Sequence, residues 1–276
     1  MICRAFAEVG DMALPIHVGA VQYATDIGDE TANTDRALHM LDDAAHSCDL
    51  VVLPEMSFVG YAPGTSAMEF AEPVPGPMTA IVSEIAVSRN AHICFGIAER
   101  DGDRIYNTAV LIGADGGVIG KHRKVRLSAL DVGAGFSIGD TPTVFETHLG
   151  RIGILIGIEA FGIEIARELG MHKAEMLVVP SMGVAVAPKT VEVAMDAWDI
   201  TLKSGARYSR CYVIWANKIG FDDEAVALGN SMILDPQGHV LARGGMEEEV
   251  VRAIIAVGEG LRAPVEERRV VRYGSG

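Results

Sequence analysis

The chain has 276 residues, 49 % of them hydrophobic and 22 % charged, which is the composition of a folded globular protein rather than a disordered or fibrous one. Its 37 acidic residues against 23 basic ones give a formal net charge of -14, so nucleic acid and anionic membrane are not expected partners. No apolar run approaches the roughly 18 residues of a membrane span, and the cysteines, which lack metal-binding or redox spacing, indicate a reducing, cytoplasmic location without a metal: Cys3, Cys48, Cys94 and Cys211.

Strands and helices are predicted to alternate through the first half of the chain. Residues 1–15 lack a basic start followed by an apolar block, so they are expected to form an extension rather than a signal peptide. Alternating apolar residues predict a strand over 16–23, and apolar residues at helical spacing predict a helix over 29–46. The same patterns predict a helix over 78–90 and strands over 49–53, 91–98, 104–112 and 118–124, the last two joined as a hairpin.

A loop is predicted over 125–150, with a short strand near 144–145. The next strand, 151–158, is mostly β-branched and apolar, which is typical of a strand buried on both faces, and a helix is expected to begin near Phe161. The elements predicted after it are a long helix over 188–210 and strands over 174–180, 211–218, 230–234, 239–242 and 250–257. An aperiodic, arginine-rich tail follows over 261–276.

The turn after the strand 151–158 is a common place for a nucleophile, because the strand fixes the backbone and the turn exposes one side chain. Gly157 stands at this turn and has no side chain to expose. A carboxylate, Glu55, is delivered in a similar way at the end of the buried strand 49–53. About ten predicted strands against about four long helices, with no linker or repeat, indicate one domain of two mixed sheets faced by helices.

Three separated segments resemble the nitrilase, or carbon-nitrogen hydrolase, superfamily. Residues 51–61 resemble the segment that carries its catalytic glutamate, and residues 120–127 resemble the segment that carries its catalytic lysine. Residues 151–161 resemble the segment of its catalytic cysteine. Order and spacing agree with this superfamily from about Ile16 to Tyr273.

The resemblance implies an α/β fold, a four-layer α-β-β-α sandwich, over residues 16–260. It also implies a homodimer or a higher homo-oligomer, in which the tail 261–276 is expected to pack on the partner. Members of this superfamily act on small amides and nitriles without a cofactor. A small amide, nitrile or amine is therefore the expected ligand.

The resemblance also implies a role for individual positions. In this superfamily a cysteine thiolate attacks the carbonyl or nitrile carbon, a glutamate acts as base and then acid, and a lysine stabilises the charged intermediate. Glu55 would be the base and Lys124 the oxyanion partner, and the cysteine would fall on Gly157. The residues expected to contact the substrate are Tyr61, Asp131, Ile158, Glu159 and Met182.

The chain departs from the pattern of the superfamily around Gly157. Many members have Phe-Pro-Glu after the cysteine segment, whereas this chain has Gly162-Ile163-Glu164. The second glutamate that often follows the lysine is matched only by Asp131, and the helical segment 205–209 also differs. Several departures together favour natural divergence, and an inactivated Cys-to-Gly variant is the alternative.

Another side chain is not expected to replace the missing thiol. Cys94 and Cys211 fall on apolar strands at core positions. Ser128 and Ser181 lie near the expected pocket in the sequence but lack an obvious histidine partner. His122, just before the lysine segment, is expected to be a solvated residue at the end of a strand.

Two functions of different classes follow from these residues. In the first, Glu55 activates water or an amine and Lys124 polarises the carbonyl of an amide, without an acyl-enzyme. In the second, the protein is a pseudoenzyme, a subunit that binds a ligand or a partner. Glu55 and Lys124 are then an inherited buried pair, which persists because removal of one charge would leave the other unpaired.

Overall fold

The computed structural model describes residues 15–60, 69–185, 188–222 and 225–258. Apart from Pro15, the predicted extension lies outside the described residues, and so do Tyr61 and the predicted tail 261–276. None of the helices in these described ranges is long and apolar enough to cross a membrane.

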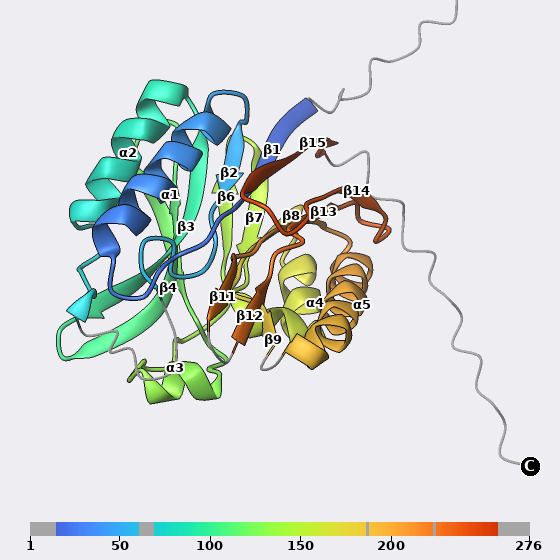
Figure 1. The fold of residues 1–276 in the computed structure, drawn as a ribbon. Coiled ribbons are helices and arrows are strands. Elements are labelled where there is room, and N and C mark those ends of the chain that lie inside the picture. The colour runs from blue at the N-terminus through green and yellow to red at the C-terminus, as the bar shows by residue number, and fades with distance from the viewer. Residues whose placement is uncertain (1–14, 61–68, 186–187, 223–224, 259–276) are drawn as a thin grey trace, which may run out of the picture.

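Two six-stranded sheets lie face to face, and helices cover their outer faces (Figure 1). The first sheet has the order β15-β1-β2-β3-β4-β5, with the strands β1 (Pro15–Gln22), β2 (Leu50–Val52), β3 (His92–Asp101), β4 (Arg104–Ile112), β5 (Val118–Arg123) and β15 (Glu249–Ala256). The second has the order β14-β13-β10-β8-β7-β6, with the strands β6 (Val144–Thr147), β7 (Gly150–Ile154), β8 (Met176–Pro180), β10 (Tyr212–Ala216), β13 (Met232–Leu234) and β14 (Val240–Arg243).

Two helices pack on each sheet. On the first sheet they are α1 (Glu30–Ala45) and α2 (Pro77–Arg89). On the second they are α4 (Ile163–Met171) and α5 (Val191–Ser209). The four-layer α-β-β-α sandwich that the resemblance implied is therefore confirmed.

Three apolar clusters fill the spaces between the four layers. Side chains alternate between the two faces of a strand, so Leu50 and Cys94 lie in the cluster between the sheets, while Val51 and Ile93 lie in the cluster beneath α1 and α2. A third cluster, which includes Trp198, lies beneath α4 and α5. Burial on both faces explains why these strands are almost continuously apolar in the sequence.

The strands that lead to the candidate site run in the same direction within each sheet. In the first sheet β2 is parallel to β3, and β5 runs the same way because β4 is antiparallel to both of its neighbours. In the second sheet β7 and β8 are parallel. The segments that follow β2, β5, β7 and β8 carry, in that order, Glu55, Lys124, Gly157 and Met182.

Two predicted boundaries are wrong. The strand expected over 151–158 ends at Ile154, and a 3₁₀ helix, η2 (Gly157–Phe161), begins at the glycine. The apolar run did not mark this end because the residues after the strand are buried as well. The loop expected over 125–150 contains a short helix, α3 (Ala129–Gly133), which is too short for helical spacing to show.

A small third sheet was not predicted. It has the order β11-β12-β9 and consists of β9 (Val184–Ala185), β11 (Ile219–Asp222) and β12 (Ala225–Leu228). Strands of two to four residues are too short for a recognisable alternation. A single 3₁₀ turn, η3 (Pro188–Thr190), leads into α5.

Candidate active site

The segment after β2 presses against β3 and fixes the backbone of Glu55. A Cβ at Gly96 would lie 2.7 Å from Met56 N and 2.9 Å from Glu55 Cα, so this close approach requires a glycine. Ser57 ties the turn together, because its Oγ donates to Pro54 O at 2.7 Å and accepts from Gly96 N at 3.0 Å. Glu55 is thus held on a turn with little freedom to shift.

We call residues 54–60, which include this turn, the Glu55 loop. Two buried side chains, Tyr23 and Lys218, hold this loop. The hydroxyl of Tyr23 donates to Ser57 O at 2.8 Å. The ammonium of Lys218 donates to three neutral oxygens, namely Met56 O at 2.7 Å, Val59 O at 2.9 Å and Thr25 Oγ1 at 2.8 Å. Burial lowers the pKa of Lys218 to about 7.

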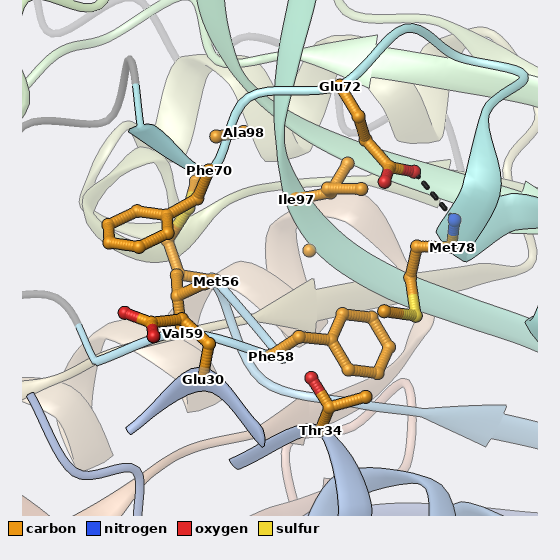
Figure 2. Close-up of a pocket in the computed structure, with 11 residues that line it drawn as sticks. Glu30, Thr34, Met56, Phe58, Val59, Phe70, Glu72, Met78, Ile97 and Ala98 are labelled. Atoms are coloured by element: carbon orange, nitrogen blue, oxygen red, sulfur yellow. Dashed lines mark hydrogen bonds between the residues drawn. The ribbon is translucent and has the colours of Figure 1, made fainter. Parts of the chain in front are cut away.

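A cavity of about 190 Å³ borders the Glu55 loop (Figure 2). Its lining includes Phe58 from the loop, Phe70 and Glu72 from the segment before α2, and Glu30 from the first turn of α1. The lining contains none of the residues that hydrogen-bond the carboxylate of Glu55. This cavity is therefore separate from the cluster around that carboxylate.

The carboxylate of Glu55 belongs to a buried cluster of two acids, one lysine and one amide. Glu55 Oε1 accepts from Lys124 Nζ at 2.6 Å and from Asn107 Nδ2 at 2.7 Å. The same lysine nitrogen lies 2.8 Å from Asp131 Oδ2, and Asn107 Nδ2 also donates to Asp131 Oδ1 at 2.9 Å. All four residues are at most 3 % exposed. The structure thus brings together Glu55, Lys124 and Asp131 as the sequence predicted.

In this cluster, charge pairing affects the pKa values of Lys124 and Asp131 more than burial does. Burial alone would lower the pKa of Lys124, but the carboxylates of Glu55 and Asp131 raise it above its usual value. Burial would likewise raise the pKa of Asp131, whereas Lys124 and the hydrogen bonds from Ser128 lower it. The lysine is therefore held as an ammonium and Asp131 as a carboxylate.

Gly157 faces the second oxygen of Glu55. The glycine has a φ of +50°, which side chains of L-residues disfavour, and a Cβ built on it would overlap Glu55 Oε2. That oxygen also accepts a hydrogen bond from Met182 N at 3.1 Å. Met182 therefore contacts the site through its backbone, and Ile158, half-buried in η2, follows directly after the glycine.

Glu159, which the sequence analysis assigns to substrate contact, bonds protein groups with both of its carboxylate oxygens. It is fully buried, and its Oε1 accepts from Val125 N at 2.5 Å. Its Oε2 accepts from Ile156 N at 2.6 Å and lies 2.9 Å from His122 Nε2. Glu159 fastens the turn of Gly157 to the segment that carries Lys124.

His122 is buried rather than solvated, which corrects the prediction for this residue. Two positions separate it from Lys124, so both side chains point to the same side of the extended chain. This spacing was the sequence signal that could have placed His122 on the buried side, with Lys124. Asn107 was also missed as a site residue; it faces the cluster from β4, and its carbonyl accepts from Lys124 N at 2.8 Å.

The described thiols lie away from this chemistry, whereas the two candidate serines border the cluster. Cys94 is fully buried between the sheets, and burial raises the pKa of its thiol. Cys211 is buried as well, and its Sγ lies 3.1 Å from Ala174 O. Ser128 caps α3, and the buried Ser181 contributes its carbonyl to Glu55 N.

Comparisons with known proteins agree with this geometry. The family model described as carbon-nitrogen hydrolase matches residues 17–259. The omega-amidase NIT2 of Xenopus tropicalis is 31 % identical over 240 residues, which cover 82 % of this chain and 83 % of that protein. A hydrolase of Pseudomonas protegens, named for its position in the pqqF 5' region, is 31 % identical over 254 residues, or 88 % of this chain and 86 % of that one.

A solved structure shares the fold. The crystal structure of Saccharomyces cerevisiae Nit3, a member of branch 10 of the nitrilase superfamily, superposes with a TM-score of 0.77 at 25 % identity. The match covers 89 % of this chain and 91 % of that one. With the family model matching most of its length, this chain belongs to the carbon-nitrogen hydrolase family.

Proposed function

We propose that this protein hydrolyses the carbon-nitrogen bond of a small amide without a thiol nucleophile, through Glu55 and Lys124. One observation carries the proposal: the buried cluster of Glu55, Lys124, Asp131 and Asn107 is complete although position 157 has no side chain. The desolvation of a buried ion pair often costs more than the pairing returns, and well-packed hydrophobic residues in its place are often more stable, so a cluster retained in full supports a use for it. The similarity to the omega-amidase NIT2 supports an amide-type substrate.

The proposed reaction uses water as the nucleophile. Glu55 Oε2, the oxygen that faces Gly157, takes a proton from the water while the oxygen of that water attacks the amide carbon. Lys124 uses two of its three N–H groups for Glu55 and Asp131, and we assign the third to the oxyanion that forms. Glu55 then returns the proton to the departing nitrogen, which yields a carboxylic acid and ammonia or an amine. No metal or cofactor takes part.

Two orphan polar atoms support the presence of a polar ligand. Asn107 Oδ1 and Ser181 Oγ are buried and have no hydrogen-bond partner among the described residues. Both belong to residues that hydrogen-bond Glu55 through their other polar groups. Buried polar atoms are almost always paired, so water or an amide group of the ligand is the expected partner.

The position of Glu55 favours a second candidate function, a binding subunit without catalysis. Its Oε2 fills the space next to Gly157 and is already paired with Met182 N. A carboxylate held in this way recognises an amide or amine nitrogen directly, and the ligand would then be bound without being cleaved.

Ammonia release from a panel of small amides separates the two functions. We expect slow turnover, more than about a thousandfold below that of thiol-dependent relatives, because the covalent route is lost. Glu55→Gln and Lys124→Ala should both abolish it, whereas Glu84→Gln, at an exposed position on α2, should leave it unchanged. If no amide reacts but one raises the melting temperature, the binding function is the correct one.

We also propose that the protein forms a homodimer or a higher homo-oligomer through α4 and α5. Large apolar side chains are exposed on these helices and on the turn before them: Phe161, Ile163, Val193, Ile200 and Tyr208. Exposed apolar patches of this kind mark interfaces. Sedimentation of the wild type and of Ile200→Glu tests this; a monomeric wild type would contradict it.

A cytoplasmic location remains a proposal. Cys48 and Cys94 are buried and form no disulfide with a described residue, which suits a reducing compartment. Localisation of the tagged full-length chain by fluorescence microscopy and fractionation tests the assignment.

A further inference from the structure

Lys218 is a buried cation that the proposed reaction does not use. Lys218 is 2 % exposed, and among the described residues its nitrogen contacts two carbonyls and one hydroxyl but no carboxylate. Buried lysines are rare unless an acid pairs with them. The hydrogen bonds and the charge of Lys218 therefore indicate a role that a neutral side chain of similar length would not fill.

The two carbonyls show what Lys218 holds. Met56 directly follows Glu55, and its φ of +49° is uncommon for a residue with a side chain. Val59 lies one turn further along the Glu55 loop, so Lys218 ties both sides of this loop to the segment between β10 and β11. The bonds stabilise a backbone conformation that Met56 would otherwise disfavour.

We propose that Lys218 is a positioning residue, which fastens the Glu55 loop through Met56 O and Val59 O and places a second positive charge behind the carboxylate of Glu55. The part of this proposal that concerns the loop and the charge stands without any turnover. Its effect on catalysis rests on the proposed function.

Thr25 allows Lys218 to hold the Glu55 loop both as an ammonium and as a neutral amine. An ammonium donates three hydrogen bonds, and the three acceptors present match them. When the proton leaves to solvent, the neutral amine keeps two N–H groups for the carbonyls, and its lone pair accepts from the hydroxyl of Thr25, which is both donor and acceptor. The loop stays fastened, and only the charge behind Glu55 changes.

The surroundings leave Glu55 as the charge that acts on Lys218. Burial lowers the pKa of Lys218, and the negative charge of Glu55 opposes this. Tyr23, which contacts the same loop, stays neutral because burial raises its pKa. Asp26, next to Thr25, is paired with Arg36 at 3.3 Å.

The charge part is tested by NMR titration of Lys218, with lysine labelled at Cε and the signal assigned through Lys218→Arg. In the wild type we expect titration near neutral pH. Glu55→Gln should lower the titration midpoint by at least about half a unit, because the favourable negative charge is lost. Glu84→Gln serves as the control and should not move it. A midpoint that Glu55→Gln leaves in place would overturn the proposal.

The positioning part is tested by amide hydrogen exchange of residues 54–60. Lys218→Met removes the two hydrogen bonds that Lys218 donates to the loop. Exchange there should be at least about tenfold faster, while β8 keeps its protection. Lys218→Arg, which retains donors and charge, should restore most of the protection. If Lys218→Met protein is folded and its loop exchanges as in the wild type, Lys218 does not position the loop. Absence of amidase activity in the wild type would leave both tests valid.

Discussion

The carboxylate of Glu55 lies against the backbone of Gly157, in the place where a side chain at that position would begin. The positive φ of the glycine adds a backbone restriction to this steric one. Glu55 and any side chain at position 157 therefore compete for the same space. The glycine is part of the packing around Glu55, and its hydrogen is what allows Oε2 to accept from Met182 N.

Gly157→Ala should destabilise the protein by more than the cost of placing an alanine at the positive φ of this position. An alanine at positive φ costs about 1 kcal/mol. We expect a further 1–2 kcal/mol or so, because Glu55 must move away from Met182 N or strain the turn. Gly102→Ala is the matched control, since Gly102 has a φ of +58° and open space around its Cβ position. Urea unfolding of both variants measures the difference, and equal losses would show that the overlap with Glu55 has no energetic weight.

Lys124→Met should be strongly destabilising. The substitution leaves Glu55 and Asp131 as buried carboxylates without a cation, which typically costs roughly 3–5 kcal/mol. Adding Glu55→Gln to this variant should recover part of the loss, because one of the two stranded charges disappears. Free energies of unfolding for the two single variants and the double variant measure the coupling. Additive losses would contradict the ion pairing described for the cluster.

The stability contributed by Asp131 should depend on pH at the acid end. Its pKa is lower in the folded protein than the ordinary value of 3.8, so the folded state binds fewer protons than the unfolded state as the pH falls below this range. The contribution is fully present above the unfolded pKa and is lost as the pH falls through the folded pKa. The difference in unfolding free energy between wild type and Asp131→Asn should thus be constant from pH 5 to 7 or so and shrink below about pH 4. A difference that grows on acidification would refute this.

No acyl adduct should form on a cysteine. The thiols of Cys94 and Cys211 are buried, and both residues lie away from the Glu55 cluster. Intact-protein mass spectrometry after incubation with a reactive amide such as fluoroacetamide should give the unmodified mass. A thiol-dependent amidase incubated with the same reagent shows that the reagent is active. Labelling of the native protein at one cysteine would point to a thiol mechanism after all.

The layers of the fold could be predicted because their signals are local. Buried strands such as β3 read as apolar runs, and α1 shows helical spacing, so element type and order follow from the sequence. The short elements were not predicted; α3, for example, begins at a capping box of Ser128 and Asp131 and is too short to show helical spacing. The end of β7 was misplaced because burial continues past Ile154.

The positions of the acids and the lysine of the site could be predicted, but most of the hydrogen bonds around them could not. Glu55, Lys124 and Asp131 were found through the resemblance, and the structure brings them together. The backbone bonds of Glu159 could not be predicted, because a sequence does not show which N–H groups a carboxylate accepts from. Lys218 gave no signal at all, because its acceptors are backbone carbonyls more than 150 positions away.

The overlap between Glu55 and position 157 has a consequence for protein engineering. A cysteine introduced at position 157 would meet the carboxylate and the unfavourable φ before any thiol chemistry could operate. Installing a thiol mechanism at this position therefore requires a second change that moves Glu55, and a screen of single substitutions would not find it.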